Sequence, residues 1–392
     1  MADIYLHDII EAYIDCRKNK RRSPEAIAFE VNYEQNCIRL FNDIISRTYN
    51  PDPSIAFVVT KPVKREIMAS SFRDRIIHHY IAMRLTPLFE AEFIEETTNC
   101  RKGKGTSYGI KLLSNSIKKA SDNYTSDCWI LKLDIKSFFM SINKELLLSK
   151  LLSFIKIKYK GSDIDSLMYL IEAVLMNDST ENCVFRSPRK AWDPLPFGKS
   201  LFDCSKGFGL APGNLTSQLE ANFFLNEFDH WVKSQALGYG RYVDDFYFVD
   251  KSKEKLSVLI PAIKSKLKEL GLTLHPGKIY LQHYAKGVKY IGAVLKCDRM
   301  YISNRTVGNF YSAIHRFNKL ADNENYIENN AEHFIASINS YLGFCRQYMT
   351  YNIRRKAIKR IDDRWWKVFY VSGHFDKLTL KKEYKSNINH IK

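Results

Sequence analysis

The chain has 392 residues, 45% of them hydrophobic and 13% aromatic, which favours a packed globular core and argues against global disorder. Its 60 lysines and arginines outnumber 43 aspartates and glutamates, and the net charge of +17 indicates a polyanionic partner, nucleic acid before an anionic membrane. The eight cysteines form no C-x-x-C pair, which argues against a zinc ribbon and is typical of a reducing cytosol. The N-terminal residues do not resemble a secretory signal and no long apolar run occurs, so we expect a cytoplasmic protein without a membrane partner.

The spacing of apolar residues predicts helices and short strands in the first half of the chain. Residues 1–48 have a helical pattern that prolines end, and residues 177–208 have no clear period, which predicts an insertion or long loop. The other elements expected in this half are a strand at Ile55–Val59, a helix at Asp74–Phe89, a glycine-containing basic loop at 99–109, a buried strand at Trp129–Asp134 and a helix at Lys144–Ile155.

Apolar residues in the second half of the chain also show helix-type and strand-type spacing. We predict a helix at Leu215–Val232, a pair of strands at 240–250 with a turn at its aspartates, a helix at Glu254–Leu270 and a strand at Lys289–Leu295. From Val307 onward the chain is expected to be helical and basic, with a polar break at 322–332.

Two adjacent acids, Asp244 and Asp245, interrupt the strand-like stretch GRYVDDFYFVD. Aspartate is a favoured turn residue, which is the simplest explanation. Two close carboxylates also repel each other unless a cation neutralises them. Asp134 ends the apolar run WILKLD, where it is either a helix N-cap or a metal ligand. Two strands that present three acids can hold two metal ions roughly 3.5–4 Å apart and carry out phosphoryl or nucleotidyl transfer.

Seven blocks resemble, in order, those of the prokaryotic reverse transcriptases. The first two are similar to the fingers blocks, the next five to palm motifs A to E, and a last segment to the helical thumb. They are AFVVTKPVKREIMASSFRDRIIHHYI, NCRKGKGTSYGIKLL, LKLDIKSFFMSI, GLAPGNLTSQLEANFFLNEFD, YVDDF, GLTLHPGK and KYIGAVL, followed by SYLGFCRQYMTYNIRRKAIKRI. The resemblance covers roughly residues 55–360.

The resemblance implies an α+β right-hand polymerase, with fingers, a palm of antiparallel sheet backed by helices, and a helical thumb. It divides the chain into an N-terminal helical extension at 1–50, fingers and palm at 51–295 with the insertion at about 177–208, and a basic helical thumb and tail at 296–392. The implied activity is RNA-directed DNA synthesis by two-metal nucleotidyl transfer.

The resemblance also implies the metal ligands. Asp134 and Asp244 would be the principal ligands of two Mg²⁺ ions, which Mn²⁺ could replace. Asp245 would be a third carboxylate, and the backbone carbonyl of Ile135 would add a ligand.

Seven positions match nucleotide-binding positions of the family. Phe139 matches the ring that excludes a 2′-hydroxyl, although it could simply be a core residue. The others are Lys61 and Arg65, which match triphosphate-binding cations but could form a solvated basic face, and Pro212, Gly213, Gln218 and Lys278. Pro212 stands where retroviral and many intron enzymes have glutamine, and GNLTSQ is similar to the enzymes of diversity-generating retroelements.

Basic residues supply the expected nucleic-acid contacts. The fingers loop would place Arg101, Lys102 and Lys104 against template phosphates, whereas Arg73 and Arg75 would contact template or hold the fingers together. The basic segment that includes Arg354, Arg355 and Lys356 suits a duplex, a structured RNA or a docked protein. The expected partners are an RNA template or associated non-coding RNA, the DNA product and dNTPs, with an accessory protein or a second copy of the chain possible.

Two other functions remain open at this stage. A catalytically idle RNA-binding scaffold would have no reason to retain three mutually repelling acids. An RNA-templated RNA polymerase shares the palm, but Phe139 argues against it. The sequence leaves open the template, the primer, and the choice between a bacterial retroelement and antiphage defence.

Overall fold

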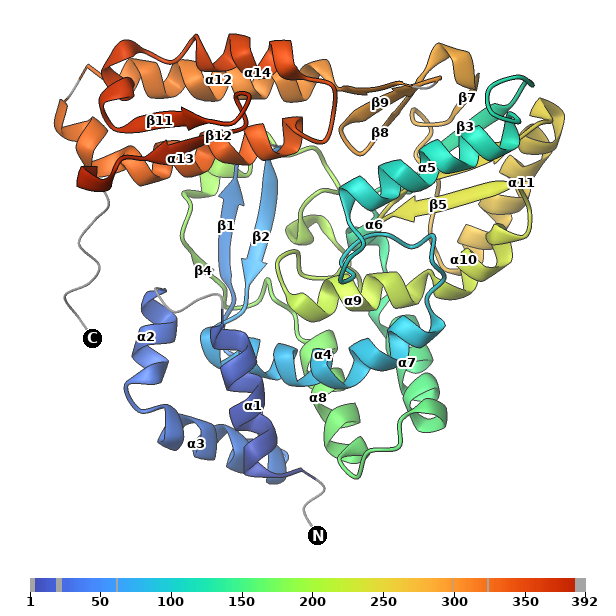
Figure 1. The fold of residues 1–392 in the computed structure, drawn as a ribbon. Coiled ribbons are helices and arrows are strands. Elements are labelled where there is room, and N and C mark those ends of the chain that lie inside the picture. Colours follow the sequence, from blue (N-terminus) through green and yellow to red (C-terminus); the bar gives the residue numbers. More distant parts are fainter. Residues whose placement is uncertain (1–3, 19–22, 61–62, 298, 323, 385–392) are drawn as a thin grey trace. The chain divides into compact units, whose positions relative to one another are not determined.

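The computed structural model describes residues 4–18, 23–60, 63–297, 299–322 and 324–384 (Figure 1). The chain forms two compact units. Unit 1 contains residues 1–116 and 129–281, and unit 2 contains residues 117–128 and 282–392. Both units combine helices with mainly antiparallel sheets, which confirms the predicted α+β class. No helix among the described residues is long and apolar enough to span a bilayer.

Unit 1 contains most of the helices and two sheets. Its helices are α1 (Leu6–Arg17), α2 (Pro24–Glu30), α3 (Tyr33–Ile45), α4 (Phe72–Glu92), α6 (Phe138–Ser141), α7 (Lys144–Lys158), α8 (Ile164–Met176), α9 (Leu215–Phe224), α10 (Asn226–Lys233) and α11 (Lys253–Glu269), and α5 (Thr106–Ala120) begins in it. Its strands are β1 (Ile55–Val59), β2 (Arg65–Ala69), β3 (Trp129–Asp134), β4 (Val184–Phe185), β5 (Gly238–Tyr242) and β6 (Asp245–Asp250), and β7 (Tyr280–His283) spans the division between the units.

The central sheet has the strand order β5-β6-β3-β7. Strand β6 lies between β5 and β3 and runs antiparallel to both. Four consecutive residues of β6, Phe246–Val249, are fully buried, as expected of a strand covered on both faces. Strand β3 begins and ends at the predicted residues, Trp129 and Asp134.

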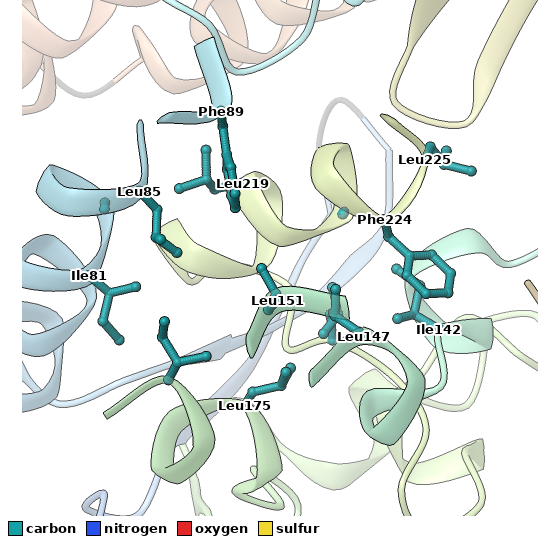
Figure 2. Close-up of a cluster of buried hydrophobic side chains, with 14 of the residues drawn as sticks. Ile81, Leu85, Phe89, Ile142, Leu147, Leu151, Leu175, Leu219, Phe224 and Leu225 are labelled. Atoms are coloured by element: carbon teal, nitrogen blue, oxygen red, sulfur yellow. The ribbon is translucent and has the colours of Figure 1, made fainter. Parts of the chain in front are cut away.

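Helices pack together beside this sheet in one apolar core (Figure 2). Figure 2 shows side chains of α4, α7, α8 and α9 converging, with Leu85, Leu151 and Leu219 among them. All three are at most 8% exposed. The same core includes residues of α1 and α3, and Arg84 of α4 forms ion pairs with Asp8 and Asp163, both at 2.7 Å. The N-terminal extension therefore packs as part of unit 1.

A second sheet, β2-β1-β4, joins the β1–β2 hairpin to the 177–208 segment. The segment is mostly irregular, as predicted, but β4 adds a parallel strand to β1. Glu66 of β2 holds the segment from inside the protein. Its carboxylate is 2% exposed and accepts hydrogen bonds from Trp192 Nε1 at 2.6 Å, the Leu201 amide at 2.8 Å and the Ser200 hydroxyl.

Unit 2 contains β8 (Val288–Tyr290), β9 (Ala293–Lys296), β10 (Arg299–Ile302), α12 (Asn304–Leu320), α13 (Glu324–Cys345), α14 (Tyr351–Ile358), β11 (Phe369–Ser372) and β12 (Lys377–Leu380). Trp365 is fully buried at its centre and stacks on Phe334 with ring centroids 4.1 Å apart. The hairpin β11–β12 packs on α13, where the Asn339 side chain hydrogen-bonds both backbone groups of Leu378 at 2.7 and 2.8 Å.

Several elements differ from the sequence prediction. The helix expected at Leu215–Val232 is two helices, because buried Leu225 leaves the helical conformation while the apolar spacing continues across it. The strand expected at Lys289–Leu295 is the hairpin β8–β9, whose turn residues Ile291 and Gly292 both have positive φ. Isoleucine disfavours that conformation, so the sequence lacked the usual turn signal.

The C-terminal region also departs from the prediction of a helical segment. Most of the expected polar break at 322–332 lies inside α13, which buries Ile327, Ala331 and Phe334 along one face. Residues 369–380 form the β11–β12 hairpin instead of helix. Helices α5 and α8 were not predicted. The division into extension, fingers with palm, and thumb stays a prediction.

The start of α4 contains a cluster of buried charges. The Asp74 carboxylate is 2% exposed and accepts hydrogen bonds from the Tyr49 hydroxyl and the Asp52 amide, both at 2.8 Å. Arg73 pairs with Asp43 at 2.8 Å and with Asp74 at 3.2 Å. Burial and the nearby charge of Asp52 raise the pKa of Asp74 to about 6, against the opposing effects of these hydrogen bonds and of Arg73.

The Glu66→Gln substitution is expected to loosen the 177–208 segment. Glutamine turns one acceptor into a donor that faces other donors, so we expect a loss of about 1–3 kcal/mol in the free energy of unfolding and faster proteolysis within this segment. Denaturant titration and limited proteolysis measure these effects. Glu181→Gln, at an exposed glutamate of the same segment, should change neither. Equal behaviour of the two variants would contradict this role of Glu66.

The Asp74→Asn substitution should change how stability depends on pH. Folded Asp74 has a raised pKa, so its contribution to stability is complete below about pH 4 and is lost as the pH rises through about 6. We expect the stability of the wild type relative to the variant to fall by up to about 3 kcal/mol between pH 4 and 7. Denaturant unfolding at several pH values tests this, with Asp165→Asn at an exposed site as control. A difference that grows with pH would contradict the assignment.

Candidate active site

The three predicted aspartates lie together at one end of the central sheet. Asp134 ends β3 and is the direct cross-strand partner of Asp245, which begins β6. Asp244 lies in the turn before β6, and its carbonyl accepts a hydrogen bond from the Ile135 amide at 3.0 Å. The turn is thus formed by Val243 and Asp244, whereas Asp245 already belongs to the strand.

Two lysines neutralise part of this charge. Lys278 Nζ lies 2.8 Å from Asp134 Oδ2, and Lys132 Nζ lies 2.9 Å from Asp245 Oδ2. Burial alone would lower the pKa of Lys278, but the hydrogen bond to Asp134 and the charges of all three aspartates raise it. Lys278 was predicted from the sequence as a nucleotide-binding residue and not as a partner of Asp134. Lys132 was not singled out, because a lysine inside a strand ordinarily indicates a solvated edge.

Burial and the remaining negative charge make Asp244 and Asp245 hard to ionise. Burial, and then the charge of Asp134, raises the pKa of Asp244. Burial, together with the charges of Asp244 and Asp134, raises the pKa of Asp245 to about 6 despite the opposing effect of Lys132. A bound cation would remove this penalty, because it favours the charged form of each carboxyl group.

The donor atoms fit a hard cation. Asp134 Oδ1 and Asp245 Oδ1 are buried and find no hydrogen-bond donor among the described residues. Such orphaned carboxylate oxygens are costly unless a partner binds them. The described acidic, histidine and cysteine side chains are nevertheless not grouped in threes as a formed metal site would require. The lysine ion pairs occupy the other oxygens of the same two carboxylates.

The residue before Asp244 has a strained backbone. Val243 has φ of 60°, in the left-handed region, where a β-branched residue is a genuine outlier. Such strain costs about 1–3 kcal/mol and persists only where the surroundings impose it, often at a functional site. Sequence analysis missed this residue, because nothing in YVDDF distinguishes a left-handed valine from an ordinary strand residue.

Phe139 lies beside motif B. It belongs to the short helix α6, is partly buried against the main core, and packs edge-on against Phe138 with ring centroids 5.8 Å apart. The Phe139 carbonyl accepts a hydrogen bond from the Leu210 amide at 2.9 Å. Its ring therefore has core contacts, and its backbone is attached to the loop expected to bind nucleotide.

The motif B loop is attached to β2. The carbonyl of Pro212 accepts a hydrogen bond from the Met68 amide at 2.9 Å. Gly213 has φ of 119°, and a Cβ there would lie 2.9 Å from Ile67 Cγ2, so glycine is needed for both conformation and space. Gln218 is exposed and accepts a hydrogen bond from Cys100 Sγ at 2.8 Å.

Two cations on other segments act on the turn that holds Asp244. Arg65 at the start of β2 is exposed, and its charge lowers the pKa of Tyr242, although burial and Cys100 raise that pKa overall. Lys199, an exposed residue of the 177–208 segment that sequence analysis did not single out, lowers the pKa of Asp244 against the larger effect of burial. Lys61 lies outside the described residues.

Several predicted nucleic-acid contacts are used inside the protein. Arg101 has a side chain only 4% exposed, pairs with Glu90 at 2.8 Å, and donates to the carbonyls of Ile94 and Thr97. Arg73 belongs to the Asp74 cluster, and Arg75 lies 3.1 Å from Glu25. Their guanidinium groups hold unit 1 together, which leaves little of Arg101 for a phosphate.

In the C-terminal segment too, one predicted contact is used inside the protein while its neighbours are exposed. Arg354 is 9% exposed and donates to the carbonyls of His374 and Phe375 and to the Asp376 carboxylate. Arg355 and Lys356 are exposed. In the fingers loop Lys102 is also exposed, whereas Lys104 donates to the carbonyl of Glu95 at 3.3 Å. Phosphate contacts therefore remain a prediction best suited to Lys102, Arg355 and Lys356.

A polar cavity of about 340 Å³ lies elsewhere in unit 1. Its described lining includes Asp74, His78, Lys144 and Glu220 but not the three aspartates. Burial raises the pKa of Glu220 to about 7, despite the charge of Lys144 and a hydrogen bond from Thr216. The cavity is therefore distinct from the cluster that carries the predicted chemistry.

Comparisons with known proteins show what the chain is similar to. Residues 60–295 match the family model described as reverse transcriptase (RNA-dependent DNA polymerase). Protein YkfC of Escherichia coli (strain K12) is 20% identical over 290 residues, which cover 64% of this chain and 69% of that protein. An apo telomerase from Candida tropicalis, truncated from its C-terminal domain, is 13% identical with a TM-score of 0.43. That match covers 69% of this chain and 60% of the telomerase chain, which is less than two thirds of its length.

The family model starts within the first fingers block, includes the second block, the three aspartates and motifs B to E, and covers more than half of the chain. It agrees with the right-hand polymerase fold that the motif order predicts. The chain therefore belongs to the reverse transcriptase family, the RNA-dependent DNA polymerases.

Proposed function

We propose that the chain copies RNA into DNA by metal-assisted nucleotidyl transfer at Asp134, Asp244 and Asp245. One observation carries this proposal: strands β3 and β6 pair Asp134 with Asp245, the turn before β6 adds Asp244, and one buried oxygen each of Asp134 and Asp245 has no donor among the described residues. Folding around a repelling trio is unfavourable, and a cation-binding function gives that arrangement a reason.

Asp134 and Asp244 are the proposed principal ligands for two divalent ions, with Asp245 and the Ile135 carbonyl as further ligands. Oxygen donors of this kind suit Mg²⁺, with Mn²⁺ as a substitute. The ions would supply activation of the primer 3′-hydroxyl and neutralisation of the triphosphate. The chain's own contribution is to fix where these carboxylates lie, because β3 and β6 are hydrogen-bonded at this point.

Other residues of the chain would bind the nucleotide. Lys278, which pairs with Asp134 here, would exchange that carboxylate for a phosphate oxygen once other positive charge reaches the site. Arg65 offers a bidentate donor for the triphosphate from the start of β2. Pro212, Gly213 and Gln218 would line the nucleotide from motif B, since β2 and motif B are hydrogen-bonded to each other.

The template and product would be held by exposed cations. Lys102, Arg355 and Lys356 have the exposure that phosphate contacts need. Such contacts position nucleic acid without reading its sequence. An RNA template or associated RNA, the DNA product and dNTPs are the proposed partners.

The cellular role is a separate proposal. The GNLTSQ block is similar to enzymes of diversity-generating retroelements, and defence-associated reverse transcriptases also vary at this block. We propose that the chain acts in a bacterial element of one of these two kinds, in the cytoplasm. Sequencing of nucleic acid that copurifies with the protein identifies the template and separates the two roles.

The Asp244→Asn substitution tests the proposed function. Asparagine has nearly the same size but removes a charged ligand, so we expect RNA-templated DNA synthesis to fall by about 10²-fold or more with folding intact. Primer extension measures the activity, and circular dichroism and thermal unfolding check the fold. Asp193→Asn, at an exposed aspartate of the 177–208 segment, should retain activity. Normal synthesis by the Asp244 variant would exclude the proposed chemistry.

The Phe139→Val substitution separates a sugar gate from a core residue. A gate predicts that ribonucleotide incorporation rises relative to deoxynucleotide incorporation, even if total activity falls. A purely structural ring predicts lower stability, by up to about 3–5 kcal/mol, and equal loss for both nucleotides. Single-nucleotide extension on a defined primer and RNA template measures the ratio. Phe138→Val, at the more deeply buried neighbour, is the control for packing loss.

A further inference from the structure

Val243 is held in a conformation that valine disfavours, directly before Asp244. Its φ of 60° lies in the left-handed region. An L-residue with a branched Cβ leaves this region unless its surroundings prevent it. The direction of the Asp244 side chain follows from the backbone of the turn, so whatever holds Val243 also orients the proposed metal ligand.

Both backbone polar groups of Val243 are bound by side chains, one from a distant segment and one from the strand that leads into the turn. The Val243 amide donates to Asn99 Oδ1 at 2.9 Å, and its carbonyl accepts from Arg241 Nη1 at 3.1 Å. Asn99 is the first residue of the basic loop at 99–109, and Arg241 lies in β5. The peptide groups on both sides of Val243 are therefore fixed by side chains and not by the sheet ladder.

Asn222 of α9 joins these two side chains to each other. Its Nδ2 donates to the Asn99 carbonyl at 3.0 Å, and its Oδ1 accepts from Arg241 Nη1 at 3.2 Å. Asn99, Asn222 and Arg241 are 3%, 1% and 0% exposed. With Val243 they form a closed and buried ring of hydrogen bonds, which we call the Val243 clamp.

Arg241 is itself anchored. Its Nε and Nη2 bind the Asp229 carboxylate at 2.5 to 3.0 Å, and both side chains are fully buried. Tyr239 and Thr97 donate to the same carboxylate at 2.6 and 2.7 Å. Burial alone would lower the pKa of Arg241, but Asp229 more than offsets this, and the pKa is raised. The guanidinium group is thus a fixed, charged donor at the Val243 carbonyl.

The backbone on the other side of β5 is fixed as well. The Arg241 amide donates to the Glu96 carbonyl, and the Thr98 amide donates to the Arg241 carbonyl, both at 3.0 Å. Residues 96–99 therefore run alongside the end of β5 and deliver Asn99 to the turn. Three segments that are far apart in sequence meet at one strained peptide.

We propose that Asn99, Asn222 and Arg241 are positioning residues that hold Val243 in its left-handed conformation and thereby aim Asp244 for catalysis. The proposal rests on the proposed function only in taking Asp244 as the reacting carboxylate. Buried polar groups that merely satisfy one another would not need to converge on a strained peptide. The clamp explains both the strain and the convergence.

The Asn99→Ala variant is the first test. Loss of the acceptor frees the Val243 amide, and a misdirected Asp244 should lower kcat by about 10- to 100-fold while the KM for dNTP changes less than about 2-fold. Single-nucleotide extension on an RNA template measures both constants. Asn36→Ala removes a hydrogen bond to Phe29 in a distant part of unit 1 and should leave both unchanged.

The Val243→Gly background distinguishes a positioning role of Asn99 from a purely structural one. Glycine adopts positive φ as readily as negative φ, so the turn then depends less on the clamp. In the Val243→Gly background, we expect the fold-reduction in kcat caused by Asn99→Ala to be roughly ten times smaller than in the wild-type background. An equal reduction in both backgrounds would show that Asn99 does not act through Val243 and would overturn the proposal.

Hydrogen exchange separates failure of the clamp from failure of the proposed function. In Asn99→Ala we expect faster amide exchange in the peptide covering 240–250 and unchanged exchange in the β11–β12 hairpin of unit 2. If the wild type shows no DNA synthesis but Asn99→Ala still speeds exchange in 240–250, the proposed function is refuted and the clamp is retained. Unchanged exchange in 240–250, with or without activity, would refute the clamp.

Discussion

The structure depends on holding three like charges together at one end of a buried sheet. Asp134 and Asp245 are cross-strand partners and Asp244 lies in the adjoining turn. Burial and mutual repulsion raise the pKa of Asp244 and Asp245, so the site is unfavourable on its own. The fully buried strand β6 and the ion pairs with Lys132 and Lys278 offset this repulsion and keep the carboxylates in register.

Much of this centre could be predicted from sequence. Strand β3 was predicted to the residue because WILKLD is a short, mostly apolar run that ends at a charge. The aspartates were found because charges inside an apolar strand have few explanations. The β8–β9 hairpin was missed because its turn uses isoleucine at positive φ, and the clamp residues were missed because Asn99 and Asn222 resemble ordinary loop and helix residues until the fold joins them.

Of the sequence features used, charge predicted the contacts of individual side chains least well. Arg101 and Arg354 were predicted to meet phosphates but bind carboxylates and carbonyls of their own unit, whereas Arg355 and Lys356 next to Arg354 are exposed. A sequence gives the number of cations but not the direction of each side chain. On α14 adjacent positions face different sides, so one basic residue is buried while its neighbours are exposed.

The contact between motif B and β2 has a mechanical consequence. The Met68 amide binds the Pro212 carbonyl, and Gly213 approaches Ile67 so closely that no side chain would fit. A displacement of β2 would therefore pull on the Pro212–Gly213 segment, to which it is hydrogen-bonded. The two surfaces proposed to face the nucleotide would then move together, so a substitution in either one would shift the position of the other.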